Sequence, residues 1–219
     1  MFEIKLVNQE AAAYAVKMWH YSKTLPKIKL IRFGVFENNE FIGVIIFSPG
    51  ASPFLGYSIG LDQTEVCELT RIALSKHETP VSQLVAECLR KLKLLNPGIR
   101  CVVSFADPKE GHKGGIYQAG NWIFTGVSSQ VVEYFLDGRW AHTRGVYNRK
   151  DRPFAPTRTT PGKFRYLFPL DKKMRRQLIP LGLKYPNAIE GLEESRSNSV
   201  TEELVQSQPI ARKNQDASR

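Results

Sequence analysis

The segment from residue 65 to residue 107 constrains the fold more than any other part of the chain. Residues 65–75 (EVCELTRIALS) and residues 100–107 (RCVVSFAD) are runs of strand length, and the second is apolar enough for a buried central strand. Residues 81–95 between them repeat apolar side chains at helical spacing. We expect Thr79 to cap this helix and Pro80 to be its first residue. The unit predicts a sheet layered against helices.

The flanking segments extend this unit into an α+β fold with a mixed β-sheet flanked by helices. Further strands are expected over residues 2–7, 30–37, 40–48, 121–128, 131–137 and 139–148, and further helices over residues 9–20, capped by Asn8, and 114–120. Glu68 and Arg71 lie three apart on the first strand of the central unit. Because side chains alternate along a strand, we expect these two to face opposite sides of the sheet.

Basic residues are concentrated in one stretch of the chain. The formal net charge is +10, and residues 139–184 hold thirteen Lys and Arg against two acids. Aromatic residues are interleaved with these bases; bases neutralise phosphates, and aromatic rings stack on nucleobases. We therefore expect nucleic-acid contact, and the plain alternative is a solvated basic face above core aromatics. The expected phosphate contacts are Arg144, Arg149, Lys150, Arg152, Arg158, Lys163 and Arg165.

Composition divides the chain into three expected parts. Residues 1–150 form a folded domain, and residues 151–186 form a basic extension that packs on the domain and contacts nucleic acid. Residues 187–219 are rich in Glu, Ser, Gln and Asn, which predicts a disordered polar tail. No apolar run approaches the roughly 18 residues of a membrane span, so no membrane partner is expected. Three scattered cysteines fit a reducing cytoplasm.

Several motifs resemble those of known families. The order of strand, long helix, strand and short helix bearing Tyr117 is similar to the GNAT acetyltransferase fold. More closely, the strings WHYS (19–22), ELTRI (68–72), SFADPKEGHKGGIYQA (104–119) and NWIFTG (121–126) resemble the Mom-type DNA-modification proteins of bacteriophages.

The Mom-type resemblance covers about residues 14–150, and it implies what this chain does. Residues 1–150 would be a GNAT-like catalytic domain acting in the cytoplasm of a bacterial host. Its reaction would convert adenine N6 in double-stranded DNA to the carbamoylmethyl (acetamido) form, which protects the DNA from host restriction enzymes.

The group donor stays open at this level. GNAT enzymes bind the coenzyme A pyrophosphate through backbone N–H groups of a glycine-rich turn at the start of the long helix. Here that position reads SKHETPVSQ, without glycine, and Pro80 has no N–H. Acetyl-CoA remains a candidate donor without its usual loop, although a group joined through CH2 requires more than acyl transfer. We expect a small-molecule or carrier-bound donor held by Arg71, Ser82 and Thr79.

The expected catalytic residues are His20, Tyr21, Asp107 and Tyr117. Ser22, Lys23, Glu68, Asn121 and Trp122 are expected to contact the substrate, because a base flipped out of the duplex needs aromatic rings and hydrogen-bonding groups around it. Each assignment has a structural alternative. Tyr117 would be a core tyrosine, His20 and Lys23 would satisfy the end of a helix, Asp107 would be a turn residue, and Glu68 and Arg71 would form buried ion pairs.

A metal centre is a further hypothesis. His20, Asp107 and His112 offer oxygen and nitrogen donors, which suit iron better than structural zinc, and the family resemblance implies iron. Two other functions fit the sequence, namely a GNAT acyltransferase acting on RNA or a small amine, and a non-catalytic DNA-binding phage protein. The sequence leaves the oligomeric state open.

Overall fold

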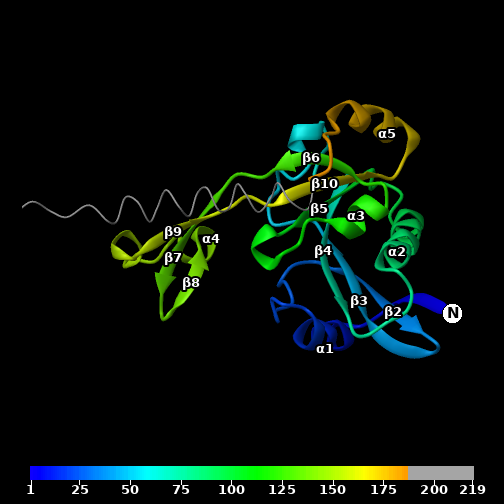
Figure 1. Ribbon diagram of the computed structural model, residues 1–219, viewed down its shortest axis with the longest axis horizontal. Helices are drawn as coiled ribbons and strands as arrows, with labels where there is room; N and C mark the ends of the chain where they lie inside the picture. Colours follow the sequence, from blue (N-terminus) through cyan, green and yellow to red (C-terminus); the bar gives the residue numbers. More distant parts are fainter. Residues whose placement is uncertain (187–219) are drawn as a thin grey trace, which may run out of the picture. The chain divides into compact units, whose positions relative to one another are not determined.

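The computed structural model describes residues 1–186 and shows an α+β fold built on a seven-stranded mixed sheet (Figure 1). In spatial order its strands are β1 (Phe2–Leu6), β2 (Ile31–Glu37), β3 (Glu40–Ser48), β4 (Val66–Leu74), β5 (Cys101–Ala106), β10 (Phe164–Pro169) and β6 (Ile123–Val127). A second sheet has the order β8 (Arg139–His142), β7 (Val131–Leu136) and β9 (Thr157–Thr160). The expected α+β class with a mixed sheet is confirmed.

Helices cover both faces of the main sheet (Figure 1). The helices are α1 (Gln9–Trp19), α2 (Val81–Leu95), α3 (Gly115–Ala119) and α5 (Lys172–Leu178), and the short α4 (Thr143–Val146) belongs to the second sheet. Side chains of α2 and α3 pack in one large core with β1, β2 and β5. Two other cores hold α1 against β3 and β4, and α5 against β5 and β10. None of the described helices combines the length and apolarity needed to cross a membrane.

The strand–helix–strand unit is confirmed, and its two strands form the parallel pair of the main sheet. The β4–β5 pairing is short: Val66, Cys67 and Glu68 pair with Cys101, Val102 and Val103, and the pairing stops there. Every other pair of neighbouring strands in this sheet is antiparallel. The amino-terminal part of β5 is therefore bound to β4, and its carboxyl-terminal part is bound only to β10.

A β-bulge in β4 corrects the expected orientation of Glu68 and Arg71. Leu69 pairs with Phe47 and Arg71 pairs with Ile46, so Thr70 is the extra residue. The bulge shifts the alternation of side chains by one position. Leu69 and Ile72 accordingly both pack in the core beneath α2, although they are three residues apart. Glu68 and Arg71 consequently share the opposite face, which α1 and α5 cover.

Two local expectations about secondary structure were wrong, and one strand was not expected. Thr79 does not cap α2, whose cap residue is Pro80 without a side-chain bond, because both donors of Thr79 bind Glu37. Residues 143–146 form the short helix α4 instead of continuing a strand. Residues 164–169, which lie in the expected extension, form strand β10 of the main sheet.

The main sheet does not end near the expected boundary at residue 150, because β10 lies between β5 and β6. The polar tail expected over residues 187–219 lies outside the described residues.

We expect two glycines in one loop to respond differently to alanine. Gly111 (φ +73°) and Gly114 (φ +82°) both have left-handed backbone, but only at Gly114 would a Cβ clash with a neighbour, the Tyr166 ring. Gly111→Ala should therefore lower the free energy of unfolding by about 1–2 kcal/mol from backbone strain alone. Gly114→Ala should cost about 1–3 kcal/mol more, because the buried ring must move.

Urea unfolding of the two variants measures this difference. Equal losses would show that Tyr166 yields freely to the added methyl group.

Candidate active site

The end of α1 brings an aromatic and imidazole cluster together. His20 follows α1 directly, and its ring centroid lies 4.3 Å from that of Tyr21. The Tyr21 centroid lies 6.0 Å from that of His112, which belongs to the loop between β5 and α3. His20 is 7% exposed, whereas Tyr21 is 50% exposed. The cluster therefore has a buried imidazole and an aromatic ring open to solvent.

His20 is neutral at physiological pH, and its hydrogen bonds fix its tautomer. Nδ1 accepts the backbone N–H of Ser22 at 3.1 Å and lies 2.8 Å from the Ser22 hydroxyl oxygen. The ring proton of the neutral form is therefore on Nε2. Burial, followed by the nearby charges of Arg71, His112 and Lys23, lowers the pKa of His20 to about 4. At neutral pH His20 offers an N–H donor at Nε2 and has no free ring nitrogen to act as a base.

A buried hydroxyl pair marks the point where β4 and β5 stop pairing. Ser104 on β5 lies with its hydroxyl oxygen 3.0 Å from the Leu69 carbonyl oxygen and 2.7 Å from the Tyr117 hydroxyl oxygen. Ser104 thus supplies the bond to β4 that the backbone of β5 no longer makes. Burial raises the pKa of Tyr117 to about 12, so its phenol stays protonated at neutral pH. Tyr117 is suited to give a proton rather than to take one.

Glu68 of β4 approaches this point, and Arg71 of the same strand lies near His20. The negative charge of Glu68 and the hydroxyl of Tyr21 lie close enough to raise the pKa of Tyr117 further. Arg71 donates from Nη1 to the Thr70 carbonyl at 2.8 Å, and its buried Nε has no hydrogen-bond partner within residues 1–186. A buried cationic donor without an acceptor is costly. It is therefore a place where an oxygen of a bound ligand would be stabilised.

The loop of residues 107–114 is held by contacts that make Asp107 structural. The Asp107 carboxylate accepts the backbone N–H of Lys109 at 3.1 Å and pairs with Lys163 Nζ at 2.7 Å. At the other end, the Tyr166 hydroxyl donates to the Lys113 carbonyl at 2.6 Å. Asp107 is thus the turn residue of the alternative interpretation, and it positions the loop that carries His112.

The proposed iron ligands do not form a metal-binding group. Across residues 1–186, no set of three or more His, Cys, Asp or Glu side chains is arranged to hold a metal ion. Asp107 is already paired with Lys163, and Nδ1 of His20 is occupied by Ser22. His20, Asp107 and His112 in this arrangement therefore do not fit an iron site.

The residues expected to contact the substrate lie in different environments. Trp122 is 1% exposed and packs between Tyr117 and Phe168, so it is a core residue and does not contact a flipped base. Asn121 is exposed in a left-handed turn after α3. Lys23 donates to the Met18 carbonyl at 3.0 Å and satisfies the end of α1. Ser22 remains in the site as the partner of His20.

Most of the expected phosphate contacts are engaged inside the protein. Arg149 is paired with Asp137 and Asp151, Arg158 with Glu133, and Lys163 with Asp107. Arg152 lies over the rings of Tyr134 and Tyr147, at 5.6 and 5.0 Å from their centroids. Arg165 donates to Thr125 and Ser58. Lys150 is exposed, and Arg144 belongs to α4. The basic stretch is therefore less available to phosphate than its charge indicates.

Sequence reasoning missed three residues of the site. Ser104 is a buried polar residue in the apolar strand CVVSFA, a contrast that would have singled it out. Tyr166 packs against Tyr117 with centroids 5.1 Å apart, and it comes from the strand that was not expected. Glu37 binds the backbone N–H groups of Glu78 and Thr79, and no local signal indicates this role.

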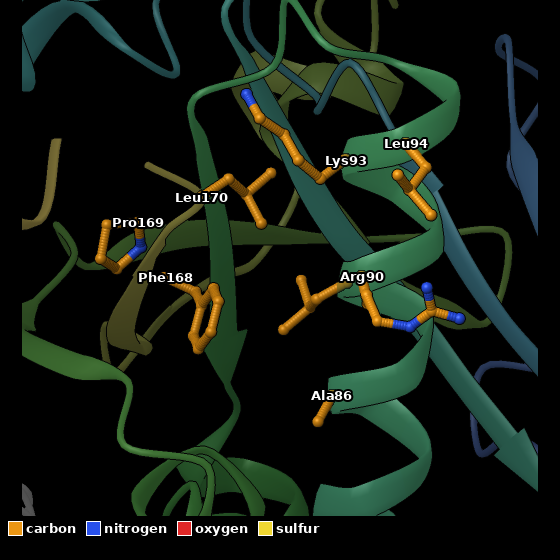
Figure 2. Close-up of a pocket in the computed structure, with 8 residues that line it drawn as sticks. Ala86, Arg90, Lys93, Leu94, Phe168, Pro169 and Leu170 are labelled. Atoms are coloured by element: carbon orange, nitrogen blue, oxygen red, sulfur yellow. The ribbon is translucent and has the colours of Figure 1, made fainter. Parts of the chain in front are cut away.

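A separate hollow lies between α2 and β10 (Figure 2). Its lining includes Leu89, Leu94 and Phe168, with Arg90 and Lys93 at its edge. Arg90 is paired with Glu87, and Lys93 donates to the carbonyls of Pro97 and Ile99. None of the residues around His20 and Tyr117 lines it. This hollow is therefore separate from the candidate active site.

We expect His20 to make stability depend on pH. The unfolded chain binds a proton at His20 below about pH 6.5, whereas the folded protein binds it only near pH 4. The contribution of His20 to stability is therefore complete above pH 6.5 and is lost as the pH falls towards 4. Between pH 7 and pH 5 this loss is about 2 kcal/mol, which His20→Gln should remove.

Chemical unfolding at the two pH values measures this effect, with His142→Gln on β8 as the control. The control should keep the full pH dependence, because His142 is exposed. A wild-type pH dependence in His20→Gln would contradict the neutral state of His20.

Comparisons with known proteins give the family of this chain. The chain is 30% identical to "Methylcarbamoylase mom" of Escherichia phage Mu over 190 residues, which cover 80% of this chain and 78% of that protein. Among solved structures, spermidine N-acetyltransferase from Vibrio cholerae in complex with CoA and spermine has a TM-score of 0.46 at 9% identity, covering 77% of this chain and 95% of that one. An N-acetyltransferase from Staphylococcus aureus Mu50 has a TM-score of 0.45 at 14% identity, covering 78% and 98%. The Mom protein family matches residues 1–187, and this chain belongs to that family.

Proposed function

We propose that this protein is a methylcarbamoylase that modifies adenine N6 in double-stranded DNA and so protects phage DNA from restriction. One observation carries the proposal: in a chain 30% identical to a methylcarbamoylase, a protonated Tyr117 lies within the electrostatic reach of Glu68 where β4 and β5 separate, and Arg71, whose Nε has no partner among the described residues, lies on the same strand near His20. A proton donor, a proton acceptor and a cation are the groups that a transfer to a weak nitrogen nucleophile requires.

The residues can be assigned to the steps of such a transfer. The N6 lone pair is delocalised into the adenine ring, so a bond from N6 to the donor carbon forms only as N6 loses a proton. We assign Glu68 to accept that proton. As the bond between the donor carbon and its leaving group breaks, Tyr117 protonates the leaving group, which departs with the electron pair. The donor is a small molecule or carrier-bound group of unassigned identity, and Arg71 Nε binds an oxygen of it.

The aromatic ring at the open side of the site is suited to a flipped base. Tyr21 is half exposed and lies beside the buried His20. An adenine extruded from the duplex would stack on this ring. The Nε2–H of neutral His20 would then donate to a base nitrogen or to the donor. His20 acts in this scheme as a hydrogen-bond donor.

The basic helix α5 supplies the phosphate contacts that the arginines paired with carboxylates do not make. Lys172, Lys173, Arg175 and Arg176 are exposed on α5, and within residues 1–186 none of them has a carboxylate partner. Gln177 of the same helix donates to the Ile59 carbonyl at 2.9 Å, which ties α5 to the loop after β3. That loop presents Phe54 and Tyr57, which are 73% and 81% exposed. Cations beside exposed aromatic rings are suited to phosphates and unstacked bases.

Modification should depend on the Tyr117 hydroxyl and the Glu68 carboxylate. The test is mass spectrometry of nucleosides from the DNA of cells that express the protein, with empty vector as the control. The wild type should yield deoxyadenosine in which CH2CONH2 replaces one hydrogen. Tyr117→Phe and Glu68→Gln should each reduce the yield by about 100-fold or more, while Tyr14→Phe on exposed α1 leaves it unchanged.

An acetylated deoxyadenosine in place of this product would contradict the proposed reaction. Full modification by Tyr117→Phe, with wild-type DNA binding, would remove Tyr117 from the mechanism.

DNA affinity should depend on salt through α5. Replacing Arg175 and Arg176 together by Gln removes two unpaired cations, so the slope of log affinity against log salt should fall by about 2. The matched control replaces Arg90 and Lys91 on α2 by Gln, which removes the same charge from a helix on the other face of the sheet. Fluorescence anisotropy with a DNA duplex measures both slopes. Equal slopes in the two variants would show that α5 does not contact phosphate.

A further inference from the structure

A carboxylate from β2 binds the loop that leads into the amino-terminal end of α2. Glu37 accepts the backbone N–H groups of Glu78 and Thr79, each at 2.8 Å, and also the Thr79 hydroxyl. Glu37 is 7% exposed. Pro80, the next residue, has no N–H to offer. The donors that lead into α2 are therefore bound to an anion that belongs to the protein itself.

The tight hairpin between β2 and β3 positions the Glu37 carboxylate. Glu37 is the last residue of β2, and Asn38 and Asn39 follow it with left-handed backbone (φ +51° and +68°). The hairpin ends beside the loop that leads from β4 to α2, because Ser75 N–H donates to the Ile42 carbonyl at 2.8 Å. The side chain of Glu37 reaches the loop at this edge. Its position is therefore set by strand pairing rather than by the helix it binds.

Glu37 is a permanent negative charge. Its hydrogen bond from the Thr79 hydroxyl, followed by those from the backbone of Glu78 and Thr79, lowers its pKa to about 2. An added anion would meet this fixed charge and would find the N–H groups already occupied. Phosphate groups bind helix starts where such N–H groups are free. Glu37 therefore opposes an added anion at the approach to α2 and already occupies two of the backbone donors there.

We infer that Glu37 is an internal anion that takes the place of a bound pyrophosphate, so that this enzyme does not hold a coenzyme A carrier at α2. The geometry of Glu37, Glu78 and Thr79 assigns Glu37 as the residue that decides donor class. With Glu37 in this position, the enzyme selects a group donor that contains no pyrophosphate group. The expected contact of Thr79 with the donor is accordingly replaced by its bonds to Glu37. The inference refines the donor of the proposed methylcarbamoylase, and its test is a binding measurement independent of modification.

The test titrates inorganic pyrophosphate and coenzyme A into the full-length protein by calorimetry. The wild type should show no binding at millimolar ligand. Glu37→Gln removes the charge with little change of shape, and Glu37→Ala empties the position. Each should bind pyrophosphate at least tenfold more tightly than the wild type. Glu40→Gln, at the exposed start of β3, is the matched control and should behave as the wild type does.

Micromolar binding of coenzyme A by the wild type that shifts the amide resonances of Glu78 and Thr79 would overturn the inference. So would a Glu37 variant of wild-type thermal stability that gains no pyrophosphate affinity. If both Glu37 variants unfold, the wild-type protein alone still tests the inference. Its Glu78 and Thr79 amide resonances should be unchanged at saturating coenzyme A.

Discussion

The short parallel pairing of β4 with β5 is the constraint on which the rest of the site depends. After Glu68 and Val103 the backbone groups of the two strands no longer pair, and polar groups left in a core must find partners. Ser104 meets this need by lying within hydrogen-bond distance of the Leu69 carbonyl and of Tyr117. One serine therefore closes the gap between the strands and fixes the phenol that stands beside it. The bulge at Thr70 lies just beyond the end of this pairing in β4. It turns the side chain of Arg71 to the face of the sheet that carries Glu68.

Burial decides which proton-transfer role is open to two groups of the site. Neutral histidine commonly accepts protons in enzymes, but burial lowers the pKa of His20 to about 4 and its Nδ1 already accepts a hydrogen bond, so His20 is a poor base at neutral pH. Tyr117 keeps its proton because burial disfavours the phenolate. The proton acceptor must then be a carboxylate. Glu68 is assigned that role because its charge reaches Tyr117.

Local patterns predicted the local elements, and long-range partners decided the rest. The apolar face of α2, the Asn8 cap and the hairpin of β2 and β3 were all readable, because each depends on neighbours in sequence. Strand β10 was missed because its bases matched the surrounding charge, and its partners β5 and β6 lie far away in the chain. The bulge in β4 and the bond from Thr79 to Glu37 likewise depend on distant segments. The motifs singled out the region around His20 and Tyr117, but they could not assign Trp122 to the core.

A count of charges gives the number of cations, and the structure shows which of them are free to bind a partner. The second sheet has three short strands and little apolar core, so its aromatic rings and arginines stabilise it together. Arg158 lies 4.3 Å from the Trp140 centroid and is paired with Glu133, and Arg149 bridges two aspartates. Charges used in this way are already neutralised and release few counterions when DNA binds. The cations of α5 have no such partners among the described residues, which is why we assign DNA contact to that helix rather than to the second sheet.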